Sequence, residues 1–188
     1  MVQDVLAPIF ESGLSKVMKL RYVAYGNVRG APGDRAGISC QHGAVECLHN
    51  RYINCAQSAN PAQDAWFPYV QCLARDLTDV AQRREGCAAD AGFDAAALRA
   101  CAEGEAGAEL ERAAYRETAA LRPAHMFVPW VVVEGVALGG DFENLDRYLC
   151  AAAAPVARCV MQFVLQQRVF FLLWGAPADS AALGVLQA

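Results

Sequence analysis

The sequence lacks the features that mark several common classes of protein. Its 16 basic residues are not clustered and stand against 20 acidic ones, which argues against the basic face of a nucleic-acid-binding protein. The longest apolar run, residues 160–175, is shorter than a membrane span and contains Gln162, Gln166, Gln167 and Arg168. The sequence therefore predicts neither nucleic-acid binding nor a transmembrane helix.

Targeting signals are also missing from the sequence as printed. The first ten residues, MVQDVLAPIF, have no basic region followed by a long apolar segment and a small-residue cleavage site. No N-x-S/T site for N-glycosylation occurs. If the protein is secreted, we expect its signal segment to lie upstream of Met1 or to have been removed.

What the sequence does have is cysteine. Its 188 residues, 55% hydrophobic and 19% charged, fit one folded domain, or one domain carrying a large insertion. Eight cysteines are more than an ordinary cytosolic domain carries, and the even count indicates disulfides or else metal and redox chemistry. Composition alone leaves both open.

The pattern of apolar residues predicts helices over most of the first two thirds of the chain, with one early strand. The expected elements are a helix at 2–15, a strand at 18–25, a loop at 28–39, a helix at 44–56, a helix from Asn60-Pro61 to about Arg84 with Gly86 as its stop, a short helix capped by Asp94 and a helix at 107–121.

After the helical block the pattern changes to that of strands. Residues 130–133 (WVVV) are typical of a buried strand, Glu134-Gly135 of a turn, and 136–138 of a returning strand, before a last helix at 142–153 capped by Asp141. This order predicts an α/β fold, thioredoxin-like, with a helical insertion at about 43–122. We assign residues 1–153 to this domain and 154–188 to a C-terminal tail of unknown structure.

The densest cysteine cluster lies at residues 40–55. Cys47 and Cys55 are eight residues apart on one predicted helix, about 12 Å along its axis, whereas a disulfide needs Cα atoms within about 7 Å. Each must therefore have another partner, and Cys40 could reach Cys47 or a distant cysteine. Because Cys87 and Cys101 bracket a turn between two helices, we predict that they pair, and leave the other pairings unassigned.

Zinc binding is the alternative use of this cluster. Cys40, His42, Cys47 and His49 are the right ligand types, but no C-x₂-C pair occurs anywhere in the chain. A Cys-His hydrolase is less well supported, since nothing orders His42 against a nucleophile. We therefore favour disulfides, and predict no metal and no cofactor.

The spacing C-Q-H-G-x₂-E-C-x₂-N-x₄-C resembles the signature of the gamma-interferon-inducible lysosomal thiol reductase (GILT) family. The matching positions are Cys40, Gln41, His42, Gly43, Glu46, Cys47, Asn50 and Cys55. Residues 25–27, 121–125, 128–133 and 148–150 are similar to further family motifs, so the resemblance covers roughly residues 1–153. The rest of the tail matches nothing known, apart from Cys159, which is similar to a C-terminal cysteine of some members.

This resemblance implies a thiol–disulfide oxidoreductase that reduces protein disulfides through a C-x-x-C at the start of its first helix. The printed sequence has no C-x-x-C, so no catalytic residue can be carried over. The first β-strand, which precedes that motif in the family, is also expected to be missing, leaving a gap between the strands at 19–25 and 130–134. Three interpretations follow: a truncated or mis-started sequence, a non-catalytic paralogue, or a tail segment, Arg168–Trp174, that fills the gap.

One active-site element of the family has a counterpart. Val128-Pro129 is similar to the cis-proline loop that contacts substrate, and we expect a cis peptide bond there. The implied partners are disulfide-containing or cysteine-bearing proteins, and the implied location is the secretory pathway, either lysosomal/vacuolar or extracellular. The alternative function is a non-catalytic secreted thioredoxin-like module that binds extended cysteine-containing peptides.

Overall fold

A computed structural model describes residues 1–33, 37–76, 79–153 and 183–187. Short helical turns cover Val2–Leu6, Leu14–Val17 and Gly139–Asn144. The longer elements are α1 (Ala7–Glu11), β1 (Lys19–Val23), α2 (Ala44–Ala59), α3 (Gln63–Leu73), α4 (Val80–Asp90), α5 (Ala95–Glu103), α6 (Glu105–Ala120), β2 (Trp130–Val133), β3 (Val136–Ala137), α7 (Leu145–Ala152) and β4 (Leu183–Gln187).

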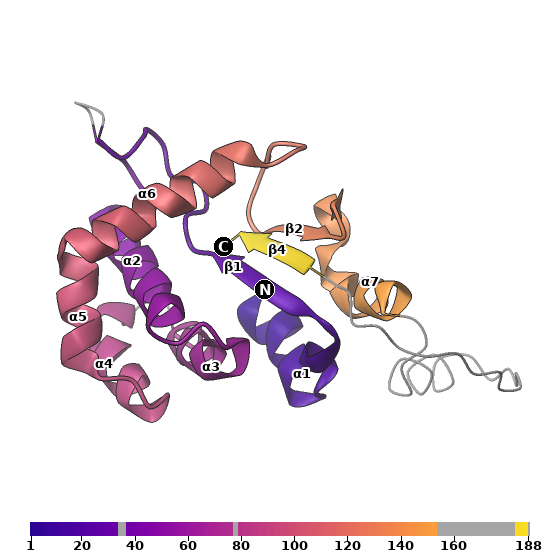
Figure 1. The fold of residues 1–188 in the computed structure, drawn as a ribbon, viewed down its shortest axis with the longest axis horizontal. Helices are drawn as coiled ribbons and strands as arrows, with labels where there is room; N and C mark the ends of the chain where they lie inside the picture. Colours follow the sequence, from indigo (N-terminus) through magenta and orange to yellow (C-terminus); the bar gives the residue numbers. More distant parts are fainter. Residues whose placement is uncertain (34–36, 77–78, 154–182, 188) are drawn as a thin grey trace, which may run out of the picture.

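The strands form one four-stranded sheet in the order β1-β4-β2-β3. β4 runs parallel to β1 and antiparallel to β2, with the backbone of Val185 opposite both Arg21 and Val132. The sequence predicts a gap between β1 and β2, and this prediction was wrong, because β4 lies there (Figure 1). Arg168–Trp174, the segment considered for that place, lies outside the described residues.

The first strand is fixed to the helical block by one side chain. Gln63, at the start of α3, accepts a hydrogen bond from the Leu20 backbone N–H at 2.8 Å and donates to the carbonyls of Ser15 and Met18. Gln63 does not cap its own helix, because α3 has no side-chain cap. Its amide instead satisfies backbone groups at the edge of β1, which sets the register between sheet and helices.

The helices α2 to α6 lie together on one side of the sheet, and α1 and α7 lie towards the other (Figure 1). A single helix from 61 to about 84 was expected, but the structure has two: α3 ends at Leu73 and α4 begins at Val80. Gly86, the expected stop, lies inside α4. Both Leu73 and Val80 are buried. The break lets α4 fold back onto α3, so that both helices bury an apolar face.

Two predicted helix boundaries are confirmed. The Asp94 carboxylate accepts hydrogen bonds from the backbone N–H groups of Ala96 and Ala97, at 2.9 and 3.1 Å, and starts α5. α6 ends at Ala120, before Pro123, as a proline requires.

Asp141 behaves differently from the expected cap. It lies in a short helical turn, and α7 begins only at Leu145. Its carboxylate accepts hydrogen bonds from the Tyr148 hydroxyl, at 2.5 Å, and from the Asn144 side chain, at 2.6 Å. These two bonds, the Tyr148 bond first, hold the pKa of the Asp141 carboxyl below its usual range.

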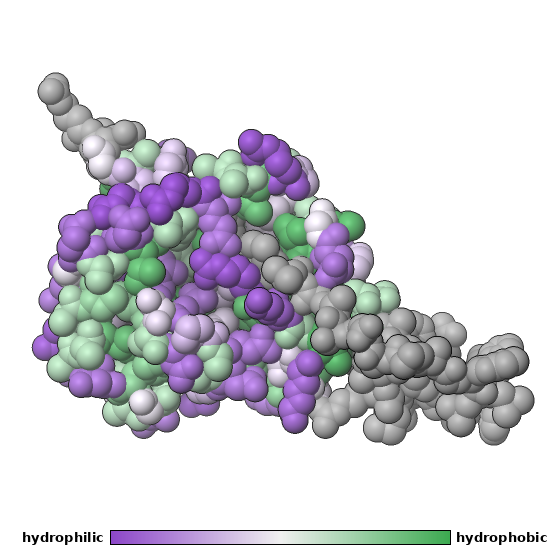
Figure 2. Space-filling model, in the orientation of Figure 1, coloured by the Kyte–Doolittle hydropathy of each residue, from purple (hydrophilic) through white to green (hydrophobic). Residues whose placement is uncertain are grey.

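The main apolar core joins the sheet to the helices. Its largest fully buried side chains are Trp66, Phe67 and Tyr69, all from α3. The outer face of α6 is hydrophilic, seen as a purple band in Figure 2. Ion pairs of Arg112 with Glu105 and Glu109 lie along this face. Within the described ranges, no helix is both long and apolar enough to span a membrane.

Candidate functional site

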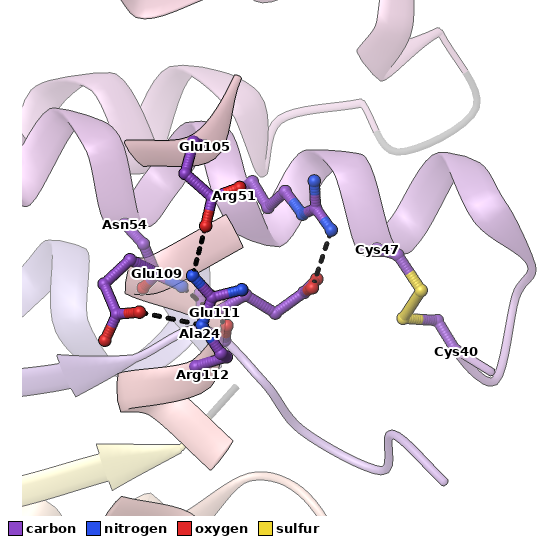
Figure 3. A network of polar contacts seen from close by, with 9 residues as sticks. All are labelled: Ala24, Cys40, Cys47, Arg51, Asn54, Glu105, Glu109, Glu111 and Arg112. Carbon is purple, nitrogen blue, oxygen red and sulfur yellow. Dashed lines mark hydrogen bonds and ion pairs between the residues drawn. A yellow bond between two sulfur atoms is a disulfide. The ribbon is translucent and has the colours of Figure 1, made fainter. Parts of the chain in front are cut away.

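The cysteine signature folds as a loop followed by the first half of α2. Cys40, in the loop, and Cys47, in the first turn of the helix, form a disulfide with their Cα atoms 5.6 Å apart (Figure 3). The sequence left the partner of Cys40 open, and the structure places it seven residues away. With both sulfurs in this bond, the two thiolates of the alternative zinc site are not available.

The other polar signature residues shape the loop between the two cysteines. The Glu46 carboxylate accepts a hydrogen bond from the His42 backbone N–H at 2.6 Å and lies 3.0 Å from its Nδ1. Asn27 donates to the Gln41 side-chain oxygen at 3.1 Å. Gly43 has φ +88° where α2 begins, a backbone conformation that favours glycine. These residues position the disulfide, and none of them lies against a nucleophile.

The signature helix α2 continues into the interior of the insertion. Arg51 donates to the Glu111 carboxylate at 2.7 Å, and Glu111 is only 4% exposed. Asn54 donates to the Ala24 carbonyl, just beyond β1, at 3.2 Å (Figure 3). Arg51, Asn54 and Glu111 were not identified from the sequence as part of the site. A signal for Arg51 was present, because it follows Cys47 by four residues and therefore lies on the same face of the helix.

Asn50, the remaining polar member of the signature, is half-buried. Its side chain makes no hydrogen bond to the described residues, and nothing in the structure explains its place in the signature.

Two further disulfides cross-link helices of the insertion. Cys55 pairs with Cys101, joining α2 to α5, and Cys72 pairs with Cys87, joining α3 to α4. The predicted Cys87–Cys101 pair was therefore wrong. Cys87 lies three residues from the end of α4, and Cys101 six residues into α5. Cys150, in α7, is also disulfide-bonded.

Two hollows flank the Cys40–Cys47 disulfide. One, of about 370 Å³, is lined by both cysteines together with Leu48 and Arg51. The other, of about 570 Å³, is lined by Cys40, Arg29 and His125, among others. The second hollow therefore brings the signature loop together with the segment that leads into β2.

The loop with the predicted substrate contact precedes β2. The Val128–Pro129 peptide bond is cis, as predicted, and both residues are half-buried. Met126, which lines the larger hollow, is 79% exposed. The larger hollow thus brings the signature loop beside His125 and Met126, which precede Val128 in the chain.

A polar cluster lies inside the helical insertion, behind the signature helix. The Arg84 guanidinium, in α4, stands 4.8 Å from the centre of the Tyr52 ring and donates to the Val45 carbonyl at 3.4 Å. Burial, and secondly the charge of Arg84, lower the pKa of His49 to about 4. His49 is therefore neutral at physiological pH.

These features define a disulfide-stabilised α/β protein whose signature loop is closed by its own disulfide. The model of one protein family, "Gamma interferon inducible lysosomal thiol reductase (GILT)", matches residues 1–91. Its matched part includes the whole signature from Cys40 to Cys55. Residues 1–91, just under half of the chain, therefore match this family.

Relatives with curated names come from a plant, from nematodes and from vertebrates. A "Gamma-interferon-responsive lysosomal thiol protein" of Arabidopsis thaliana is 28% identical over 77% of this chain and 59% of its own length. The "Gamma-interferon-inducible lysosomal thiol reductase" of Mus musculus is 29% identical over 70% of this chain and 53% of its own length. That of Carassius auratus is 29% identical over 65% and 49%. The chain thus spans about half to three fifths of these relatives.

Proposed function

We propose that this chain is part of a thiol–disulfide oxidoreductase that reduces disulfides in protein substrates, built on a thioredoxin-like sheet. The observation that carries the proposal is the complete family signature, Cys40 to Cys55, folded as one loop-and-helix unit beside His125 and Met126, which lead into the Val128-Pro129 loop. The names of the relatives, thiol reductase and lysosomal thiol protein, agree with this chemistry.

The 188 residues of this chain supply the framework and the substrate contact for that reduction, and not the reacting cysteines. Reduction by a C-x-x-C proceeds by attack of one thiolate on the substrate disulfide, and the second thiol then resolves the mixed disulfide. None of the 188 residues belongs to a C-x-x-C. We therefore assign to these residues the disulfide-stapled framework and the substrate contact, and expect no catalytic reduction through a C-x-x-C from them alone.

Val128 and Pro129 are the proposed substrate contact. They directly precede β2, whose first residue is Trp130, and an extended peptide can add to backbone at such a place as a further strand. The adjoining hollow of about 570 Å³ has room for a peptide side chain. A cysteine-bearing segment bound here would lie beside the signature loop.

The proposed location is the secretory pathway, either lysosomal/vacuolar or extracellular. Disulfides persist in oxidising compartments and are rare in the cytosol. Three disulfides join described cysteines, and the printed names of the relatives include the word lysosomal.

The alternative is a non-catalytic module that binds extended cysteine-containing peptides at the same loop. An insulin-turbidity assay on the chain extended by an upstream strand and C-x-x-C, run beside a peptide-binding titration, separates the two functions. Reduction of insulin at a rate that one Cys→Ser change abolishes would end the binding-only alternative. Binding of a cysteine-bearing peptide that is weakened by a bulky change at Val128, with no reduction under any condition, would instead support it.

A further inference from the structure

The Cys40–Cys47 disulfide differs in its surroundings from Cys55–Cys101 and Cys72–Cys87, the other two disulfides between described cysteines. Cys55 and Cys87 are buried members of the main apolar core, and their partners Cys101 and Cys72 pack against it. Among the described residues, neither Cys40 nor Cys47 belongs to that core. The bond joins a loop to the first turn of a helix, so opening it parts no two helices of the insertion.

This disulfide is also open to small molecules. Both cysteines line the hollow of about 370 Å³, and Cys40 lines the larger one as well. Cys47 is half-buried, and the loop residues between the two cysteines are mostly exposed. Figure 3 shows the bond at the start of α2, one helical turn before Arg51. Cys40 itself is buried, at 6% exposed, so a thiol approaches the bond from the side of Cys47.

The electrostatics favour a thiolate at Cys47. It lies in the first turn of a 16-residue helix, where the partial positive charge of the helix N-terminus stabilises an anion. Arg51, one turn further on, lines the same hollow. The nearest carboxylate, Glu46, is bonded to the backbone and ring of His42.

We propose that Cys40 and Cys47 form a thiol–disulfide exchange site whose substrates are small thiols and the thiols of cysteine-bearing peptides. The proposal requires no C-x-x-C and so does not rest on the function proposed above.

The exchange runs in two balanced steps. A substrate thiolate attacks Sγ of Cys47, the Cys47–Cys40 bond breaks, and its electron pair leaves with Cys40, which takes a proton from water. A second substrate thiolate then attacks the substrate sulfur of the mixed disulfide and releases Cys47 as a thiolate. Two substrate thiols end as one disulfide, and the protein gains two electrons.

The test compares Cys40–Cys47, Cys55–Cys101 and Cys72–Cys87 in the unmodified, oxidised chain. The folded protein is incubated with reduced glutathione, quenched in acid at intervals, alkylated with N-ethylmaleimide and mapped by peptide mass spectrometry. We expect Cys40 and Cys47 to be alkylated at least tenfold faster than Cys72, Cys87, Cys55 and Cys101, with a glutathione adduct on Cys47. Equal rates for all six cysteines, or earlier opening of another disulfide, would overturn the proposal.

Two variants test the helix effect separately. Cys40→Ser leaves the Cys47 thiol in the first turn of α2, whereas Cys55→Ala leaves Cys101, equally half-buried, in the last turn of α5. We expect Cys47 to react with iodoacetamide at pH 7 at least tenfold faster than Cys101. A Cys47 thiol no more reactive than Cys101, in variants that keep the circular dichroism of the parent, contradicts the proposed site.

Discussion

Arg51 and Glu111 lie 60 residues apart in the chain and form an ion pair, 2.7 Å long, between α2 and α6. The carboxylate is almost fully buried and the guanidinium is 28% exposed, so the pair joins the signature helix to the far end of the insertion. Arg51 lies one turn along α2 from Cys47, so the pair anchors the helix that carries the Cys40–Cys47 disulfide to α6 (Figure 3).

Removal of one partner of this pair is expected to destabilise the protein strongly. Arg51→Met leaves the Glu111 carboxylate buried without its cation, at a cost of about 3–5 kcal/mol in the free energy of unfolding. The double variant Arg51→Met/Glu111→Leu is expected to recover most of that loss, because it leaves no buried charge. Urea denaturation of both variants and the parent measures it, and a double variant as unstable as the single one would contradict the pair's proposed role.

The stability of the fold should decrease at acidic pH because of His49. Folding lowers the pKa of this side chain from about 6.5 to about 4, so below pH 6.5 the unfolded chain binds a proton that the folded chain does not. The stabilisation is complete above pH 6.5 and is lost as the pH falls towards 4. For a half-buried ring we expect about 2 kcal/mol.

Two variants check this pH dependence in urea titrations between pH 4 and 7. His49→Gln should flatten the slope over this range, while Arg84→Met, which removes only the second cause of the shift, should reduce it by a smaller amount. A slope unchanged in His49→Gln would assign the acid sensitivity to another group.

The disulfides should differ in their contribution to stability according to the loop each one closes. Cys55–Cys101 spans 46 residues, and its removal as Cys55→Ala/Cys101→Ala is expected to cost about 4 kcal/mol. Cys40–Cys47 spans seven, and Cys40→Ala/Cys47→Ala is expected to cost about 2–3 kcal/mol and to leave the helical content unchanged. Circular dichroism with denaturant titration gives both quantities, and a larger loss for the short loop would refute this order.

The place of β4 predicts a pattern of hydrogen exchange. Its five residues are paired with β1 on one side, and four of them with β2 on the other, so their backbone amides should exchange as slowly as those of Val131 and Val132. A proline at Val185 should disrupt this central strand, at a cost of about 3 kcal/mol or more. Exchange of the 183–187 amides within seconds would show that the strand is not paired in this way.

Elements with a local cause were predictable from the sequence. Asp94 starts α5 because its carboxylate has the backbone N–H groups of the first turn within reach, and β2 follows from four consecutive apolar residues. Features that depend on contacts with distant parts of the chain were not predictable from the sequence. The break between α3 and α4, the pairing of Cys87 and the position of β4 follow from how helix faces and strand edges meet. No short window of sequence contains that information.

The candidate site divides in the same way. The signature residues from Cys40 to Cys55 stand out by their spacing, and the structure adds what each one contacts. The ion pair of Arg51 with Glu111 and the two hollows beside the disulfide could not be read from the sequence. They require α6, and the segment that contains His125, to be brought against the signature loop.

The most direct measurement of the proposed function is insulin reduction by two proteins, the printed chain and a fusion that adds a β-strand and a C-x-x-C before Met1. The added strand is expected to pair between β1 and β2, where β4 lies in this structure. The fusion is therefore made in two forms, with and without residues 183–188, so that β4 does not compete for that position. We predict a rate at least tenfold higher for the fusion, abolished by Cys→Ser in its C-x-x-C. A folded fusion that reduces insulin no faster than the printed chain would contradict the assignment of this framework to a thiol–disulfide oxidoreductase.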